Sequence, residues 1–327
     1  MKNRLLLLFA SIYTLTLISC KKEEIPYPQW SILQSGIDKE ITSIYFINNK
    51  TGFAVSEGII LKTDNGGIEW QNIDCPTSSG LNSIFFLNEN LGFISGHNGT
   101  ILKTTSGGNS WRYYPTGTLY DLKSIYFINE MIGYAVGMDL MSPKGIALKT
   151  VDGGINWEIL NPEIDCPLNS VYFIDSNRGF AVGHKGNIIK TSDGGYTWIK
   201  LVNETDNVFR TISFINENVG FVGGGTTSDG VGICLKTENK GETWTSVWTP
   251  SRHITSFYFQ DSNNGFATSY DNKLNGLLLK TVDGGLSWII QKSEIEFNGI
   301  YCSSFPSPNI GFLAGISGTI VKYENNK

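Results

Sequence analysis

The chain has 327 residues, of which 12% are aromatic and 37 are glycine, and its formal net charge is −5. This length allows one large domain or two ordinary ones, and the apolar fraction and modest charge exclude an intrinsically disordered chain. Abundant glycine with many short apolar runs is typical of an all-β protein with tight turns.

The first 19 residues have the pattern of a secretory signal peptide. Lys2 and Arg4 form a basic start, and an uncharged apolar run follows from Leu5 to Ile18. That run is shorter than the roughly 20 residues that a membrane-spanning helix needs. We therefore expect residues 1–19 to be a signal peptide that is removed from the mature protein.

The signal ends in the sequence LISC, whose cysteine is Cys20. This sequence resembles the bacterial lipobox, in which the cysteine becomes the lipidated first residue, and an ordinary cleavage site with a chance cysteine is the alternative. We expect lipidated Cys20, a tether over residues 20–28, and an outer-membrane lipoprotein that is periplasmic or surface-exposed. The charged KKEE run after Cys20 resembles surface-export signals of some Gram-negative groups, although a hydrophilic spacer explains it nearly as well.

The mature chain is acidic. Removal of Lys2 and Arg4 with the signal leaves 23 basic and 30 acidic residues, a formal charge of −7. A negatively charged protein repels a phosphate backbone, so we expect no nucleic-acid partner.

The remaining cysteines do not indicate a metal site. Cys234 and Cys302 fall within strand patterns and are expected to be buried as small hydrophobic residues. Cys75 and Cys166 lie in loops two repeats apart, and the sequence does not decide whether they form a disulfide. The spacing of the four resembles no zinc site, and we expect no cofactor.

A nine-residue motif recurs along the chain. Its first copy is KTDNGGIEW, Lys62 to Trp70, and five further copies end at Trp111, Trp157, Trp198, Trp244 and Trp288. Together with Trp30, these tryptophans fall at intervals of 40 to 46 residues. A glycine before an aromatic residue recurs at the same period, at Gly52, Gly92, Gly133, Gly179, Gly220, Gly265 and Gly311. Both markers count seven units.

Each unit contains four short β-type segments, which in the second unit are SIFFL, GFISG, TILKT and WRYY. Four strands repeated at this length are the signature of propeller blades. The seventh unit ends before its tryptophan strand, while the strand QWSIL around Trp30 stands unpartnered at the start. We therefore predict an all-β fold over residues 29–327: a seven-bladed β-propeller of four-stranded blades, with the last blade closed by the N-terminal strand.

The repeated motif is interpreted as a structural turn. Its fourth position always holds a short polar residue that can bond the backbone two residues on, namely Asn65, Ser106, Asp152, Asp193, Asn239 or Asp283. Its sixth position is always glycine, as a turn with positive φ requires. Asn and Ser are poor replacements for Asp in a cation site, which disfavours calcium binding.

The motif resembles the Asp-box, also called the bacterial neuraminidase repeat, and its copies cover essentially the whole mature chain. The long form, with S-I-x-F ahead of the glycine and I-L-K-T ahead of the Asp-box, is similar to the photosystem II assembly factor family. That resemblance implies a seven-bladed propeller that has no enzymatic activity and binds other proteins during assembly. Photosynthetic members have arginine-rich binding surfaces, whereas this chain keeps only Arg112, Arg178, Arg210 and Arg252 after the signal.

Sialidases also carry Asp-boxes, so the alternative function is a carbohydrate-binding or glycan-hydrolysing surface lipoprotein. A sialidase needs three arginines that converge on the carboxylate of its substrate. Arg112 is expected on an outer strand and Arg178 in a turn at the far end of its blade, so at most two arginines can converge. We therefore expect no enzyme activity.

The candidate binding face is the end of the propeller opposite the Asp-box turns. One polar residue is expected to enter each inner strand there: Thr42, Asn82, Lys123, Asn169, Arg210, Thr255 and Asn298. We expect Lys123, Arg210, Arg252 and His253 to bind the partner, because they place positive charge on one face of an acidic protein. The expected partner is an envelope protein or an anionic glycan, and the protein is expected to be a monomer.

Overall fold

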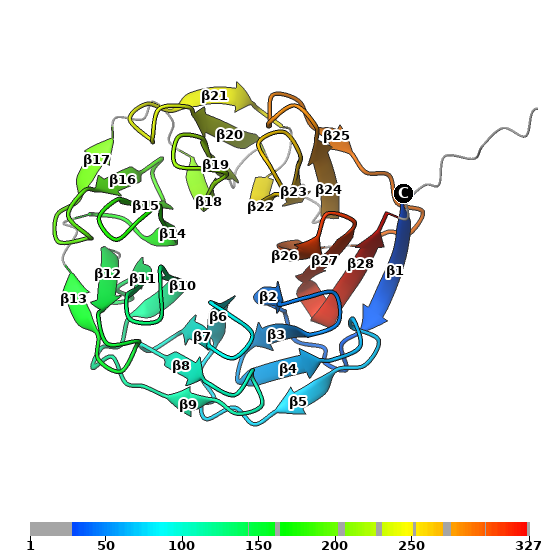
Figure 1. The fold of residues 1–327 in the computed structure, drawn as a ribbon, viewed down its shortest axis with the longest axis horizontal. Coiled ribbons are helices and arrows are strands. Elements are labelled where there is room, and N and C mark those ends of the chain that lie inside the picture. Colours follow the sequence, from blue (N-terminus) through cyan, green and yellow to red (C-terminus); the bar gives the residue numbers. More distant parts are fainter. Residues whose placement is uncertain are drawn as a thin grey trace, which may run out of the picture.

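The protein is a closed ring of seven four-stranded antiparallel sheets, the blades, around a central axis (Figure 1). The computed structural model describes residues 28–142, 144–160, 164–201, 207–226, 231–250, 253–270, 276–297 and 299–325. Within these ranges the only helix is the three-residue η1 (Ile316–Gly318), and no helix is long and apolar enough to cross a membrane. The predicted seven-bladed β-propeller is confirmed.

Each blade is a meander whose first strand lies nearest the axis. Blades 1 to 3 consist of β2 (Ser43–Phe46), β3 (Gly52–Ser56), β4 (Ile59–Thr63) and β5 (Gln71–Ile73); β6 (Leu81–Phe86), β7 (Gly92–Gly96), β8 (Ile101–Thr104) and β9 (Arg112–Tyr113); and β10 (Asp121–Phe127), β11 (Gly133–Met138), β12 (Gly145–Thr150) and β13 (Glu158–Leu160).

Blades 4 to 6 continue the pattern with the same strand order. They consist of β14 (Leu168–Phe173), β15 (Gly179–Gly183), β16 (Ile188–Thr191) and β17 (Ile199–Leu201); β18 (Val208–Phe214), β19 (Gly220–Gly225), β20 (Gly232–Thr237) and β21 (Thr245–Trp248); and β22 (His253–Phe259), β23 (Gly265–Tyr270), β24 (Gly276–Thr281) and β25 (Ile289–Ile290).

Blade 7 is built from both ends of the chain, as the sequence predicted. Its inner strands are β26 (Ile300–Ser307), β27 (Ile310–Gly315) and β28 (Thr319–Glu324), and its outer strand is β1 (Gln29–Gln34). β1 pairs with β28 antiparallel along its whole length (Figure 1). The ring therefore closes with hydrogen bonds, and β28 does not remain an open edge.

Stacked aromatic rings join every blade to the next. The aromatic residue after the repeated glycine stacks on a ring from the inner strand of the following blade, with centroids 3.5 to 5.1 Å apart. Phe53, for example, stacks on Phe86, and Phe312 of blade 7 stacks on Phe46 of blade 1. The apolar clusters accordingly lie between neighbouring blades. The glycine-aromatic marker in the sequence thus marks the blade interfaces.

Candidate functional site

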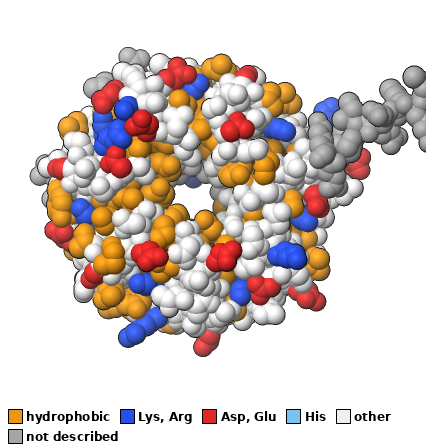
Figure 2. All heavy atoms as spheres, in the orientation of Figure 1, with side chains coloured by type: hydrophobic (Ala, Val, Ile, Leu, Met, Phe, Trp, Pro, Cys, Tyr) orange, Lys and Arg blue, Asp and Glu red, His pale blue; other side chains and the backbone are white. Residues whose placement is uncertain are grey.

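Antiparallel meanders place the turns of each blade alternately on two faces of the ring. The turn between the first two strands and the Asp-box turn share one face. Figure 2 shows charges of both signs scattered among apolar side chains around a central opening. The crossover into each blade and the turn between strands two and three share the other face. We call the axial end of that second face the mouth.

The Asp-box turns are held by a pair of side chains in each motif. The threonine two residues before the fourth position accepts a hydrogen bond from the N–H of the sixth-position glycine at 2.9 to 3.0 Å. Every glycine at this position has positive φ, as predicted. The threonine hydroxyls also contact the side chains of Asn65, Ser106, Asp152, Asp193, Asn239 and Asp283.

One detail of the predicted turn needs correction. The fourth-position side chain accepts the backbone N–H four residues on, at 2.9 to 3.2 Å, and not the one two residues on. The two-residue contact is made instead by the threonine, whose hydroxyl lies 3.2 to 3.4 Å from the N–H of the fourth-position residue. The threonine was missed, although it stands in all six copies of the motif.

The lysine before that threonine holds the next blade. Lys103 Nζ donates to the carbonyl of Gly153 at 2.7 Å, and Lys149 Nζ donates to the carbonyl of Gly194 at 2.8 Å. Both acceptors lie in the Asp-box turn of the following blade. In these copies the K-T pair of the motif joins the Asp-box turns of neighbouring blades.

At the mouth, the first strand of six blades contains a β-bulge. The irregularity lies at Asn82, Lys123, Asn169, Arg210, Thr255 and Tyr301. The first five were predicted as mouth residues, but blade 7 contributes Tyr301, whereas the predicted Asn298 lies outside the described residues. The sequence does mark the bulge, because each bulged residue, like Thr42 in blade 1, stands ten positions before the repeated glycine.

Several mouth residues connect one blade to the next. Thr42 Oγ1 donates to the carbonyl of Leu81 at 2.6 Å, Asn82 Nδ2 to Leu122 at 3.0 Å, and Asn169 Nδ2 to Phe209 at 2.7 Å. In each case the acceptor is the carbonyl just before the bulge of the following blade. These polar groups are already used by the fold, so they are weak candidates for binding a partner.

Lys123 belongs to a buried charge cluster. Its Nζ lies 2.6 Å from Asp121 Oδ2, and the Asp121 side chain is almost fully buried. Asn82 Nδ2 donates to the other carboxylate oxygen at 2.6 Å, and His97 Nε2 lies 3.7 Å from it. The charge of Lys123 is therefore neutralised within the protein. Asp121 was not recognised in the sequence, because no repeat of the motif marks it.

Arg210 differs from the other mouth residues. Its guanidinium carbon lies 5.9 Å from the centre of the Tyr270 ring, and its Nε is buried without a hydrogen-bond partner. Among the described residues it makes no ion pair. Burial lowers the pKa of nearby His184, and the charges of Arg210 and Lys123 lower it further. The neighbourhood of Arg210 is thus positive and lacks an anionic partner.

Two other predicted binding residues are placed differently. The prediction that His253 contacts a partner is corrected, because its side chain is only 3% exposed and stacks on Tyr270 with centroids 5.2 Å apart. It supports Tyr270 from the interior. Arg252 lies outside the described residues. The arginines of the sialidase alternative do not gather here, since Arg112 lies on outer strand β9 and Arg178 pairs with Asp175 and Glu217.

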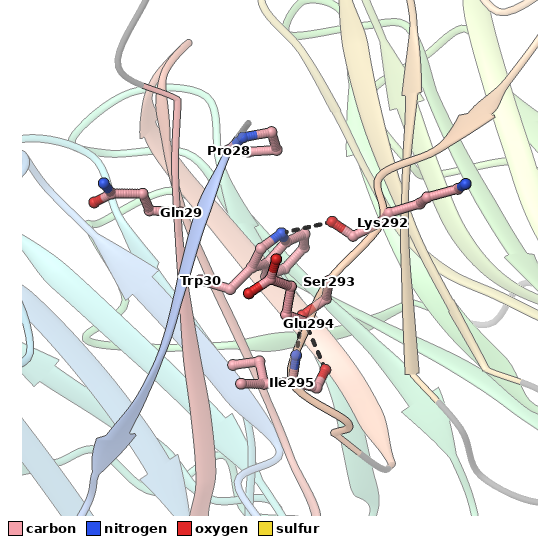
Figure 3. A pocket seen from close by; sticks show the side chains of 7 residues that line it. All are labelled: Pro28, Gln29, Trp30, Lys292, Ser293, Glu294 and Ile295. Carbon is pink, nitrogen blue, oxygen red and sulfur yellow. Dashed lines mark hydrogen bonds between the residues drawn. The ribbon is translucent and has the colours of Figure 1, made fainter. Parts of the chain in front are cut away.

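Two cavities lie at the mouth side of blades 1 and 2 and at the seam of blade 7. One of about 720 Å³ lies on the mouth side between blades 1 and 2 and is lined almost wholly by polar residues, including Lys39, Glu40, Glu57 and His97. The other, of about 650 Å³, lies at the seam where β1 closes the ring. Figure 3 shows Trp30 of β1 facing the segment 292–295, with its ring N–H donating to the carbonyl of Lys292 at 3.0 Å.

The described residues contain no group of three or more His, Cys, Asp or Glu side chains that could hold a metal ion. Cys75, Cys166, Cys234 and Cys302 are all free thiols. Cys234 is buried in β20, and Cys166 lies beneath the turn of His184.

Comparisons with known proteins agree with this geometry. The family described as photosynthesis system II assembly factor YCF48 matches residues 22–118, 69–167 and 154–253. None of the curated proteins matches the chain.

Several solved structures have the same fold. "YCF48 bound to D1 peptide" superposes with a TM-score of 0.72 at 21% identity, over 91% of this chain and 98% of that one. YCF48 from Cyanidioschyzon merolae gives 0.68 at 18% identity, over 90% and 98%. The GH74 enzyme of Niastella koreensis gives 0.73 at 14% identity, over 90% of this chain but 54% of the enzyme.

These structural likenesses concern the fold, because all lie below 25% identity. The sequence match is a separate observation, and its segments run without a break from residue 22 to residue 253, well over half of the chain. The chain belongs to the YCF48 photosynthesis system II assembly factor family.

Proposed function

We propose that this protein is a non-enzymatic lipoprotein of the bacterial cell envelope that binds a partner protein at the mouth of its propeller, as an assembly or binding scaffold. The observation that carries the proposal is Arg210. Its guanidinium makes no ion pair with any described residue, and the side chain is only partly buried, so its outer N–H groups remain accessible. An anionic ligand would supply the acceptors that the protein does not.

The chemistry of the site indicates the ligand. Arginine binds carboxylates through paired N–H groups, and the planar side chain also stacks on aromatic rings. Arg210 already lies over Tyr270, which leaves its outer N–H groups for a carboxylate. With Lys123 neutralised by Asp121, Arg210 is the main candidate for contact with an acidic side chain of the partner.

Family membership supports a protein ligand over a glycan. In the related structure a peptide is bound to YCF48, and this chain shares that fold over nearly all of its length. The charge of Arg210 and the tyrosines beside it would also suit the alternative ligand, an anionic glycan. The likeness to the GH74 enzyme supports no hydrolase, because the chain spans about half of that enzyme.

Capture of the partner from native membranes tests the proposal. Tagged wild-type protein is crosslinked in its own membranes, and the recovered partner is compared with that recovered by Arg210→Met and by Arg112→Met. Arg112 is an exposed arginine on outer strand β9 and serves as the matched control. We expect Arg210→Met to recover less partner than wild type, with the largest difference at low salt, because raised salt screens the charged contact that only the wild type makes.

The melting temperature distinguishes lost binding from lost folding. Arg210→Met removes an unsatisfied donor and keeps the apolar stem, so the variant should melt at the wild-type temperature or above it. Arg112→Met should retain the partner. If Arg210→Met captures the partner as well as wild type does, the mouth is not the binding site.

A further inference from the structure

The cavity between blades 1 and 2 contains one charge that the protein does not neutralise. Lys39 Nζ lies 3.2 Å from Glu57, and Lys123 is neutralised by the buried carboxylate described above. The remaining charged residue of the lining is Glu40, whose side chain makes no ion pair within the described ranges. It is exposed, and its backbone carbonyl is held by the Ser56 hydroxyl at 2.6 Å. The carboxylate is therefore available while its backbone is fixed.

Two tyrosines connect Glu40 to Arg210 across the mouth. Arg210 lies over Tyr270, and the Tyr270 ring meets the Tyr301 ring edge-on, with centroids 5.7 Å apart. Burial raises the pKa of Tyr301, the charge of Glu40 raises it further, and the charge of Arg210 opposes both. The segments of Tyr301 and Glu40 also meet directly, because Cys302 Sγ lies 3.9 Å from the carbonyl oxygen of Ile41. We call Arg210, Tyr270, Tyr301 and Glu40 the charged tyrosine strip.

The strip has the features of a preorganised binding surface. Arg210, Tyr270 and Tyr301 lie on β18, β23 and β26, strands of three neighbouring blades, and Glu40 lies on the crossover into β2. Both tyrosines are half-buried, so their rings are held while one side stays accessible. Tyrosine and arginine are the residues most enriched at binding hot spots, and rigid supports reduce the entropy lost on binding.

We propose that the strip binds a mixed-charge peptide segment, with an acidic side chain at Arg210 and a basic side chain at Glu40 that extends into the polar cavity. This inference rests on the proposed function, since it takes the mouth as the binding site, and it adds the ligand class. Segments that carry only acids meet repulsion at Glu40, so the two opposite charges also fix the direction in which the peptide lies.

Short fluorescent peptides provide the test. Each carries one Glu and one Lys separated by about two to six residues, a range that spans roughly 7 to 20 Å in extended chain. Matched peptides replace the Lys or the Glu by Gln, and a heparin oligosaccharide serves as the anionic glycan. Binding is measured by fluorescence polarisation at low salt with wild type, Arg210→Gln, Glu40→Gln and Glu89→Gln. Glu89 is an exposed glutamate on the opposite face and serves as control.

For wild type and Glu89→Gln, we expect one Glu–Lys spacing to bind best. Loss of either peptide charge should weaken that binding about two- to fivefold, which corresponds to one exposed ion pair. Glu40→Gln should lose the preference for Lys over Gln and keep the preference for Glu. Arg210→Gln should weaken all Glu peptides alike.

The outcomes separate this inference from the function on which it rests. If Glu40→Gln keeps the full preference for Lys while Arg210→Gln loses binding, the mouth binds acidic ligands but the mixed-charge assignment is wrong. If neither variant differs from wild type, the mouth itself is wrong. Tighter Arg210-dependent binding of the heparin oligosaccharide than of any peptide overturns the peptide assignment in favour of a glycan.

Discussion

A Cβ atom on Gly108, in the Asp-box turn of blade 2, would lie 2.1 Å from the ring of Phe53 in blade 1. Carbon atoms cannot approach so closely, and the Phe53 ring is itself stacked on Phe86 and cannot move away. The turn of one blade is therefore packed against the inner core of the blade before it. The same approach recurs at Gly241 and Gly285, where a Cβ would lie 2.3 Å from Phe180 and 2.5 Å from Phe221, so in these copies packing favours glycine in addition to the positive φ.

We expect Gly108→Ala to destabilise the protein far more than Gly117→Ala. Both glycines have positive φ, but a Cβ on Gly117 would meet no atom within 4 Å. Alanine at Gly117 should cost about 1–2 kcal/mol for its backbone conformation. Alanine at Gly108 should add about 1–3 kcal/mol for overpacking. Urea denaturation of the two variants measures the difference, and equal losses would show that the turn is not packed against Phe53.

A second prediction concerns the threonine of the motif. Thr281 Oγ1 accepts the buried N–H of Gly285 at 2.9 Å and donates to Asp283 at 2.8 Å. Thr281→Val has nearly the same shape but leaves that N–H without a partner, which should cost about 1–3 kcal/mol. Thr281→Ser keeps the hydroxyl and should cost much less. The ratio of the two losses, measured by urea denaturation, tests whether the hydroxyl or the packing matters.

The sequence predicted the fold because its markers coincide with contacts that every blade must make. The repeated glycine and aromatic residue mark the stacked rings between blades, and the missing seventh tryptophan strand indicated that β1 closes the ring. The Asp-box side chains were assigned to the turn, but the partner N–H was placed two residues too early. Spacing alone does not show whether an Asx-type side chain or the preceding threonine reaches a given N–H.

The candidate site was predictable only in part. Lys123 and Arg210 were both expected at the mouth. Nothing in the sequence showed that Asp121 neutralises Lys123, or that Arg210 has no such partner among the described residues. Asp121 and Lys123 lie two residues apart on β10, but only the bulge between Leu122 and Ser124 brings their side chains together. Tyr301 was missed because blade 7 has Tyr-Cys where the other blades have a polar residue followed by Ser or Thr, and counting back from the repeated glycine locates it correctly.

The Asp-box carboxylates should make stability depend on acid pH. Hydrogen bonds from Ser287 and Thr281 lower the pKa of Asp283 to about 2. Burial raises the pKa of Asp193, but hydrogen bonds from Thr197 and Thr191 outweigh it and lower that pKa to about 2. Both groups have an ordinary pKa of 3.8. A lowered folded-state pKa stabilises the fold above about pH 4, and this stabilisation is lost as the pH falls towards 2.

Asparagine separates charge from turn geometry. Asn65 and Asn239 already fill the same position and accept the same backbone N–H, so the variant Asp193→Asn/Asp283→Asn should keep the turns. It should lose less stability than wild type between pH 4 and pH 2. The matching alanine variant should lose about 0.5–2 kcal/mol per turn at neutral pH, by analogy with helix caps. Urea titrations across this pH range decide, and identical pH slopes for wild type and the asparagine variant would contradict the assignment.

The proposed lipid anchor depends on Cys20. We expect Cys20→Ala to block lipid attachment and to leave uncleaved precursor or released protein, because the lipidated residue must be a cysteine. Labelling of cells with a fatty-acid analogue measures attachment, and fractionation measures release. Cys75→Ala, which changes a free loop cysteine, is the control and should keep both the label and the location. Label that persists in Cys20→Ala would reject the lipobox interpretation.

The last prediction concerns the closing strand. A protein that starts after Leu33 loses most of β1, so β28 is left with an open edge. It also loses Trp30, which lies 5.4 Å from Phe297 and 5.1 Å from Tyr323 between ring centroids. Open strand edges pair with other molecules, so we expect a lower melting temperature and aggregation. Removal of residues 21–27 alone touches none of these contacts and should leave the melting temperature unchanged.

A peptide of residues 28–36 supplies a control for the first deletion. Added to the shortened protein, it can occupy the vacant edge of β28 and restore the contacts of Trp30, so it should raise the melting temperature in a concentration-dependent way, because binding to the folded state stabilises that state. The same peptide with Ala in place of Trp30 should restore less, since the indole N–H to Lys292 and both ring contacts are gone. If the shortened protein melts like the intact one and ignores the peptide, hydrogen bonding by β1 is not what closes the ring.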